Sequence, residues 1–122
     1  MSKILLVEDD TSIAKLYKTE LSLRGHEVSH VTDGKDLVDV VVKTNPDIIL
    51  LDIQLPTIDG LSVLADLKKN EKTKNIKVLM LSNYANEENI EKALSMGAVD
   101  FIPKHRIVPE ELGVKVESIL AQ

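Results

Sequence analysis

The stretch Asp47-Ile48-Ile49-Leu50-Leu51-Asp52 decides the fold of this chain. Four consecutive aliphatic residues, the first two of them β-branched, predict a strand that is buried on both faces. Such a strand lies in the centre of a parallel sheet whose two sides are covered by helices. The run ends in Asp52, at the edge where open α/β sheets bind their ligands. Taken alone, Asp52 is equally well explained as a polar residue that marks the end of a strand.

Short apolar runs predict four further strands, over residues 3–7, 26–31, 77–81 and 100–103. The run at 26–31 alternates polar and apolar residues, which is typical of a half-exposed edge strand. Apolar residues recur at helical spacing between the strands, so a helix is expected after each of them. The residues expected to face inward in the first two helices are Ile13, Leu16, Tyr17, Leu21, Leu37, Val38, Val41 and Val42.

Signals that start and stop helices support this alternation. Asp10, Thr11 and Ser12 are all candidates to cap the first helix, and Gly25 ends it. Five strands that alternate with five helices predict an α/β fold with a parallel sheet covered on both faces. The sequence contains no repeat and no linker, so we expect one domain over residues 1–122. Three signals begin the later helices: Asp59-Gly60, Asn86 and Pro109.

Several polar residues are expected to have structural or surface roles only. Asp10 is expected to cap a helix, and Asp59 to form a turn, because Asp-Gly pairs favour turns. His26 and His30 flank the edge strand and are expected at the surface. The lysine-rich segment 68–75 is predicted to be a solvated loop.

The composition excludes several classes of function. The net charge of −5 argues against direct binding of nucleic acid, which needs a basic surface. The chain has no cysteine, so it has neither a disulfide framework nor a thiolate metal site. No apolar run approaches the length of a membrane span or of a signal peptide's apolar region. We therefore expect a soluble, cytoplasmic domain without contact to a membrane.

Polar side chains stand at the carboxyl ends of four predicted strands. Glu8 and Asp9 follow the first strand, and Asp52, Ser82 and Lys104 follow the third, fourth and fifth. The carboxyl ends of parallel strands meet at one edge, so these groups converge. Two carboxylates about 4 Å apart repel by roughly 4 kcal/mol at an effective dielectric constant near 20. A divalent cation such as Mg²⁺, together with Lys104, is the natural compensation.

With these residues, and with the loop from Leu55-Pro56 to Asp59-Gly60, the chain resembles the receiver domain of two-component response regulators, in particular the chemotaxis-regulator type. The resemblance covers essentially the whole chain. It implies a flavodoxin-like, doubly wound (βα)5 fold with strand order 2-1-3-4-5. It also implies a signalling switch that takes a phosphoryl group from a sensor histidine kinase or a histidine phosphotransfer protein, and that is no enzyme beyond its own phosphorylation and dephosphorylation.

The resemblance implies a role for each site residue. Asp52 is the phosphoacceptor, and Lys104 holds a phosphoryl oxygen. Asp9, Asp52 and the backbone carbonyl of Gln54 bind Mg²⁺ directly, while Glu8 acts through a metal-bound water. After phosphorylation Ser82 moves its hydroxyl onto another phosphoryl oxygen. Phe101 matches the family's aromatic switch position, whose ring turns inward as Ser82 moves.

In the family, phosphorylation changes the face formed by the fourth helix, the fifth strand and the fifth helix, which then binds a downstream protein. The chain departs from the family after Lys104, where His105 replaces a proline that is usually joined by a cis bond. A cis bond before a non-proline residue costs about 3 kcal/mol. The sequence leaves open whether the Lys104–His105 bond is trans with a rebuilt loop or cis under strain.

Three other functions remain as alternatives. A phosphatase that forms an aspartyl phosphate typically carries a second Asp two residues after its nucleophile, where this chain has Gln54. A flavin-binding domain of similar topology would need a Ser/Thr-rich phosphate loop after the first strand, where acidic residues repel phosphate. A receiver-shaped domain that no longer takes phosphate is supported only by the missing proline after Lys104.

Overall fold

Strands and helices alternate along the chain as the sequence predicts. The structure is a computed structural model, and it describes residues 2–122. None of the helices within these residues has the length and apolar character that a membrane span requires. The strands are β1 (Lys3–Val7), β2 (Glu27–Val31), β3 (Ile48–Leu51), β4 (Lys77–Ser82) and β5 (Asp100–Pro103). The α-helices are α1 (Thr11–Leu23), α2 (Leu37–Thr44), α3 (Gly60–Lys69), α4 (Glu87–Ser95) and α5 (Pro109–Leu120), and a short 3-10 helix covers Lys104–Arg106.

The five strands form one parallel sheet in the order β2-β1-β3-β4-β5. This confirms the predicted fold class and strand order. β3 lies in the middle, between β1 and β4, with Leu6 opposite Leu50 and Leu51 opposite Met80. All four residues of β3 are completely buried, which confirms the prediction for Ile48–Leu51. The strand that ends at Asp52 is therefore the most deeply buried part of the sheet.

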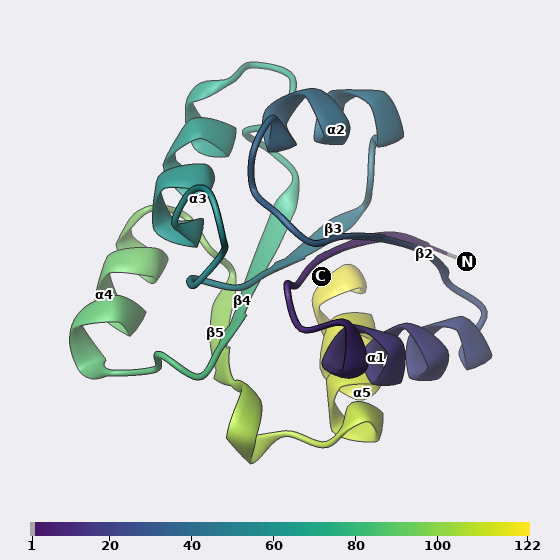
Figure 1. Cartoon of the computed structure of the whole chain (residues 1–122). Coiled ribbons are helices and arrows are strands. Elements are labelled where there is room, and N and C mark those ends of the chain that lie inside the picture. The colour runs from purple at the N-terminus through teal and green to yellow at the C-terminus, as the bar shows by residue number, and fades with distance from the viewer. Residues whose placement is uncertain (1) are drawn as a thin grey trace.

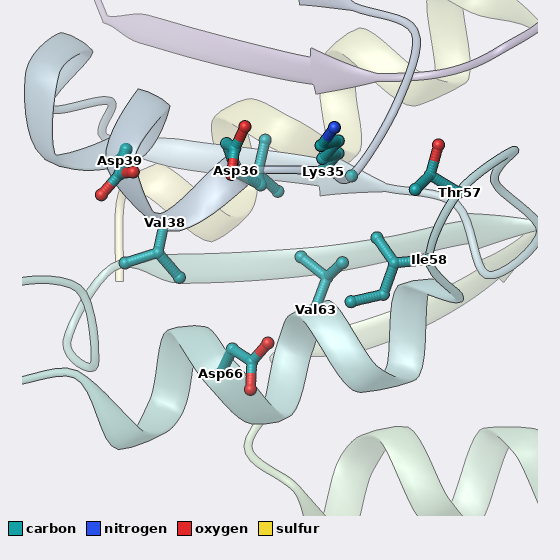
Figure 2. A pocket seen from close by; sticks show the side chains of 10 residues that line it. Lys35, Asp36, Val38, Asp39, Thr57, Ile58, Val63 and Asp66 are labelled. Carbon is teal, nitrogen blue, oxygen red and sulfur yellow. The ribbon is translucent and has the colours of Figure 1, made fainter.

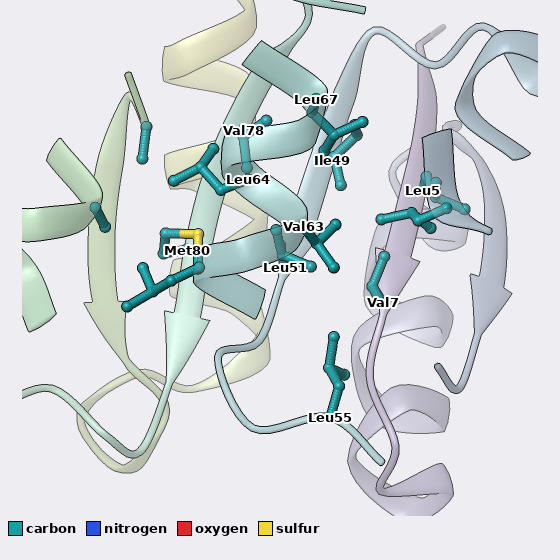
Figure 3. Close-up of a cluster of buried hydrophobic side chains, with 14 of the residues drawn as sticks. Leu5, Val7, Ile49, Leu51, Leu55, Val63, Leu64, Leu67, Val78 and Met80 are labelled. Atoms are coloured by element: carbon teal, nitrogen blue, oxygen red, sulfur yellow. The ribbon is translucent and has the colours of Figure 1, made fainter. Parts of the chain in front are cut away.

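Alternate residues of the central strands face two separate apolar cores. Leu5 and Ile49 face α2, α3 and α4, whereas Leu6 and Leu50 face α1 and α5. Figure 1 shows these two helical layers on opposite sides of the sheet, and Figure 3 shows side chains of the first core. Each fully buried leucine or isoleucine contributes about 1.5–3 kcal/mol to folding. The two cores fix the carboxyl edge of the sheet from both sides.

The helix caps agree with the sequence signals. Asp10, rather than Thr11 or Ser12, caps α1, because its carboxylate accepts hydrogen bonds from the N–H groups of Ser12 and Ile13. Asp59 caps α3 through the N–H of Leu61, and Asn86 caps α4 through the N–H of Asn89. These side chains satisfy N–H groups that a helix leaves without partners at its start.

Two residues predicted to face inward do not. The side chains of Leu16 and Val42 are 60% and 40% exposed. Each follows or precedes a residue of the buried stripe, Tyr17 or Val41, and neighbouring residues point about 100° apart around a helix. The buried stripes of α1 and α2 are narrower than the apolar pattern suggests.

The lysine-rich segment is better anchored than the sequence predicts. Lys68 belongs to α3, and its ammonium group donates to the backbone carbonyls of Lys74 and Ile76. Burial lowers the pKa of this lysine. Thr73 is buried, and its hydroxyl donates to the carbonyl of Leu67 at 2.6 Å. The prediction of a solvated loop over 68–75 is therefore wrong for these residues, because polar side chains tie the turn to the end of α3.

His26 was expected at the surface, but its side chain is only 9% exposed. Its Nε2 lies 3.0 Å from a carboxylate oxygen of Glu117. Arg24 pairs with Glu20 and with Glu117, at 2.7 Å in each case. We call Glu20, Arg24, His26 and Glu117 the helix-end cluster, since it joins the end of α1 and the start of β2 to α5. The sequence gives no sign that Arg24 and His26 pair with Glu117, because 93 and 91 positions separate them from it along the chain.

Candidate functional site

The site forms where β1, β3 and β5 end. Glu8 and Asp9 follow β1, Asp52 follows β3, and Lys104 follows β5. Because the strands are parallel and adjacent strands are in register, these ends lie at one edge of the sheet. The structure thus brings together the acidic side chains that the sequence expects to converge there.

Lys104 connects two of the acids. Its ammonium nitrogen lies 2.7 Å from Oδ2 of Asp52 and 2.5 Å from Oε1 of Glu8. The three side chains are only 8%, 6% and 2% exposed. Burial disfavours the charge on Lys104, but hydrogen bonds to Asp52 and Glu8 outweigh this effect and raise its pKa. Lys104 therefore stays charged, and it neutralises one of the negative charges of the site.

Glu8 is held from two directions. Oε1 accepts from Lys104, and Oε2 accepts from the N–H of Asp10 at 3.0 Å. Burial raises the pKa of the Glu8 carboxyl, and the hydrogen bonds from Lys104 and Asp10 oppose this shift only in part. Both oxygens of Glu8 therefore already have partners inside the protein.

The donor set suits a hard divalent cation. Glu8, Asp9 and Asp52 each offer a carboxylate oxygen, and these three oxygens all lie within 4.8 Å of one another. Asp9 is exposed, whereas the other two are buried. The N–H of Gln54 donates to Oδ1 of Asp52 at 3.3 Å, which keeps the loop after β3 close to the acid. Carboxylate and carbonyl oxygens with room for water are the ligands that Mg²⁺ prefers.

Ser82 and Phe101 are positioned differently from the acids. Ser82 is fully buried, and its hydroxyl oxygen accepts from the N–H of Tyr84 at 3.1 Å. No hydrogen bond within residues 2–122 joins the Ser82 hydroxyl to Asp52. Phe101 is 7% exposed and packs in the core between the sheet and the α2, α3 and α4 layer. In this structure the aromatic ring therefore points inward.

The chain between Lys104 and α5 answers the question that the sequence left open. No peptide bond among the described residues is cis, so the bond between Lys104 and His105 is trans. The 3-10 helix Lys104–Arg106 forms the rebuilt loop, and His105 and Arg106 are exposed on it. Lys104 reaches Asp52 without the proline that is usual in the family.

Two residues that support the site were not recognised in the sequence. A Cβ atom on Gly60 would lie 1.9 Å from the carbonyl oxygen of Asp52, so only glycine allows this close approach. The N–H of Gly60 also donates to the carbonyl of Ile53 at 2.6 Å. His30 is half-buried, and its Nε2 lies 2.7 Å from the carbonyl oxygen of Glu8, which corrects its assignment to the surface. For Gly60 the sequence signal is the Asp59-Gly60 pair, which predicts a turn, the start of a helix and the family's loop, but not this close contact.

Comparisons with known proteins agree with this geometry. The family model described as the response regulator receiver domain matches residues 4–117. One curated relative, the DNA-binding dual master transcriptional regulator RpaA of Synechocystis sp., is 33% identical over 120 residues, which are 98% of this chain and 49% of that protein. This chain therefore spans about half the length of the curated relatives it matches.

Solved structures show the same fold over nearly the whole chain. The receiver domain of a Francisella response regulator has a TM-score of 0.89 and 30% identity, over 99% of this chain and 98% of that one. The BeF3-activated N-terminal receiver domain of Klebsiella pneumoniae RstA also has a TM-score of 0.89 and 30% identity, over 98% and 99% of the two chains. From the family match, the sequence relatives and the shared fold, we conclude that this chain belongs to the response regulator receiver family of two-component systems.

Proposed function

We propose that this chain is a phosphoacceptor receiver that takes a phosphoryl group onto Asp52 from the phosphohistidine of a sensor histidine kinase or a histidine phosphotransfer protein. The contact that carries this proposal is the one between Lys104 and Asp52, at 2.7 Å, beside the oxygens of Glu8 and Asp9. An acid next to one fixed cation and a second cation site has what phosphoryl transfer requires, namely positioning and charge neutralisation.

In the proposed reaction an oxygen of Asp52 attacks the phosphorus atom of the phosphohistidine. The new O–P bond forms as the P–N bond breaks, and the imidazole leaves and takes up a proton. Lys104 is the protein's own cation for the phosphoryl oxygens, and its raised pKa keeps it protonated throughout the neutral range. Its contact with Glu8 holds the ammonium group in place before the donor arrives.

Asp9, Asp52 and the backbone carbonyl of Gln54 are the proposed ligands of Mg²⁺. Glu8 is proposed to act through a metal-bound water, because Lys104 and the N–H of Asp10 already occupy its two oxygens. When bound, Mg²⁺ neutralises charge on the phosphoryl oxygens. Asp9, which is exposed, is the acid most accessible to an incoming ion.

Ser82 and Phe101 are the proposed switch residues. For its hydroxyl to reach a phosphoryl oxygen, Ser82 has to give up the hydrogen bond from the N–H of Tyr84. Phe101 is proposed to exchange between an outward position and the inward one seen here, and to turn inward as Ser82 moves. The face built from α4, β5 and α5 is then proposed to present a different surface to a downstream protein.

The proposed activity is signalling and not turnover of an external substrate. Gln54 stands where an aspartyl-phosphate phosphatase needs an acid, so hydrolysis of a phosphomonoester is expected to be slow. We also propose that residues 1–122 act as a single cytoplasmic unit that does not itself contact nucleic acid or membrane, in keeping with a net charge of −5. The DNA binding named for RpaA belongs to a protein about twice as long.

The test is intact-mass spectrometry after incubation with Mg²⁺ and a small phosphodonor such as acetyl phosphate. The wild-type protein is expected to gain the mass of one phosphoryl group, and a chelator is expected to prevent the gain. Asp52→Asn is expected to remove the adduct. If the wild type gains no phosphoryl group, or Asp52→Asn gains as much as the wild type, the proposed function is wrong.

Asp10→Asn is the matched control. Asp10 is a neighbouring acid, but its carboxylate caps α1, and asparagine is an equally good cap. This variant is expected to be phosphorylated like the wild type. A loss in Asp10→Asn equal to that in Asp52→Asn would mean that general loss of acidic charge, and not the position of Asp52, explains the result.

A further inference from the structure

A groove of about 500 Å³ lies away from the phosphoacceptor site, between the start of α2 and α3. One wall is the turn before α2 and its first residues, the other is α3, and the loop after β3 closes one end. Figure 2 shows three apolar side chains, Val38, Ile58 and Val63, between the two walls. A groove of this size accepts several side chains of a partner.

The floor of the groove is apolar and firmly packed. Val38 and Ile58 are half-buried and lie against the core to which the buried Val63 belongs. A Cβ atom on Gly34 would lie 2.7 Å from Val63 and 2.9 Å from Ile58, so the turn before α2 rests directly on these side chains. The backbone of this turn therefore packs against side chains of α3 and of the loop after β3, and the groove exists before any partner arrives.

The rim of the groove is acidic on both sides. Asp36 and Asp39 stand on the α2 wall and Asp66 on the α3 wall, and Figure 2 shows them on opposite sides of the apolar floor. All three are exposed, and none belongs to a salt bridge within residues 2–122. Lys35 is the single basic residue that lines the groove. The net charge of the lining is therefore negative.

We propose that this groove docks a basic amphipathic helix of a partner protein. An apolar stripe on such a helix fits the floor formed by Val38, Ile58 and Val63, and lysine or arginine residues beside the stripe face the rim acids. Asp36 and Asp39 are three residues apart, which is close to one helical turn and matches the spacing of basic residues along one side of a helix. Asp66, on the opposite wall, favours a helix that carries basic residues on both sides of its apolar stripe.

The charge pattern decides between kinds of partner. An acidic or neutral helix would leave the rim carboxylates unpaired, and like charges placed together at an interface are strongly unfavourable. The phosphoacceptor site is not part of this groove, so the proposal is independent of phosphorylation. It assigns a second interaction surface, distinct from the face of α4, β5 and α5.

The test uses a synthetic helix of roughly 18 residues, about five turns, with leucine on one face and lysine on both flanks. The peptide is titrated into the ¹⁵N-labelled full chain, and the amide shifts are followed by NMR. The changes are expected to cluster in residues 34–39 and 57–66. A matched peptide with glutamate in place of lysine is expected not to bind.

The variant Asp39→Asn/Asp66→Asn is expected to weaken binding about fivefold, as two rim charge pairs are lost. Glu27→Gln/Glu91→Gln removes the same charge from exposed positions on β2 and α4, and is expected to bind like the wild type. Equal weakening in both variants, shift changes outside the groove, or no binding overturns the proposal. Self-association of the chain that Asp39→Asn/Asp66→Asn abolishes, without peptide binding, would instead assign the groove to a second copy.

Discussion

The candidate site and the helix-end cluster both combine carboxylates with basic side chains, but they differ in burial and in charge. The site gathers three acids, Glu8, Asp9 and Asp52, near one lysine, and the side chains of Glu8, Asp52 and Lys104 are less than one-tenth exposed. The helix-end cluster pairs two acids with Arg24 and His26, and the side chains of Glu20, Arg24 and Glu117 are 20–40% exposed. Apart from the exposed Asp9, the first cluster is buried and has more carboxylates than cations, while the second reaches solvent.

This difference separates a chemical site from a structural one. Exposed ion pairs are screened by water, and each contributes little, so the helix-end cluster mainly joins α1 and β2 to α5. A buried excess of carboxylates is costly unless a further cation arrives or a proton is retained. The pKa values of the two glutamates differ in the same way. Burial raises the pKa of Glu8, whereas the hydrogen bond with His26 is the main cause of the lowered pKa of Glu117.

The largest expected effect is that of Lys104→Met, which leaves Glu8 and Asp52 without their cation. Removing one partner of a buried ion pair typically costs about 3 kcal/mol, and we expect a loss of this size in urea unfolding. Added Mg²⁺ is expected to recover part of the loss, because it supplies positive charge to the same acids. The matched change in the other cluster, Arg24→Met, is expected to cost less and to be insensitive to Mg²⁺. Equal losses in both variants would contradict the comparison.

Alanine substitutions of Gly60, beside Asp52, and of Gly113, beside Arg24, compare the two clusters in a second way. In Gly60→Ala the new methyl group meets the carbonyl of Asp52, so the loop has to move; we expect a loss of about 1–3 kcal/mol and little phosphorylation. In Gly113→Ala the new methyl group meets the side chain of Arg24, which can move away. Alanine is also better than glycine in a helix by about 1 kcal/mol, so this variant should be near neutral. Normal phosphorylation of Gly60→Ala would show that the contact is unimportant.

The smallest expected effect is in the pH dependence of stability. The folded pKa of Glu8 is raised, so without metal its contribution falls as pH rises from 4.5 through that pKa. The folded pKa of Glu117 is lowered, so its contribution is present above pH 4.5 and is lost as pH falls through that pKa. In a plot of stability against pH, Glu8→Gln should therefore remove the decrease above pH 4.5, and Glu117→Gln the decrease below pH 4.5. Denaturant unfolding between pH 3 and 7 measures this, and a change of the same sign in both variants would contradict it.

The sequence was sufficient to predict the strands and helices whose apolar residues follow a regular pattern. Ile48–Leu51, the end of that strand at Asp52 and the alternation of strands with helices follow from apolar patterning alone. The strand order came from the family resemblance. The convergence of Glu8, Asp9 and Asp52 then followed, because parallel strands end at one edge.

The remaining features depend on how elements dock, which periodicity does not encode. The apolar pattern does not give the width of a buried stripe, so Leu16 and Val42 were placed inward although both are exposed. Nothing near His30 in the sequence indicates that it contacts the carbonyl of Glu8. The need for glycine at position 60 arises only when α3 packs against the loop after β3. The Lys104–His105 bond likewise required three-dimensional information.

The proposed phosphoryl transfer depends most directly on a divalent cation bound near Glu8, Asp9 and Asp52. Calorimetric titration of Mg²⁺ into the wild type, Asp9→Asn and Asp10→Asn compares two adjacent acids, of which only Asp9 belongs to the metal donor set. We predict that Asp9→Asn weakens Mg²⁺ binding at least about tenfold and that Asp10→Asn binds like the wild type. Equal affinity in Asp9→Asn and the wild type, or equal loss in both variants, would contradict the central claim.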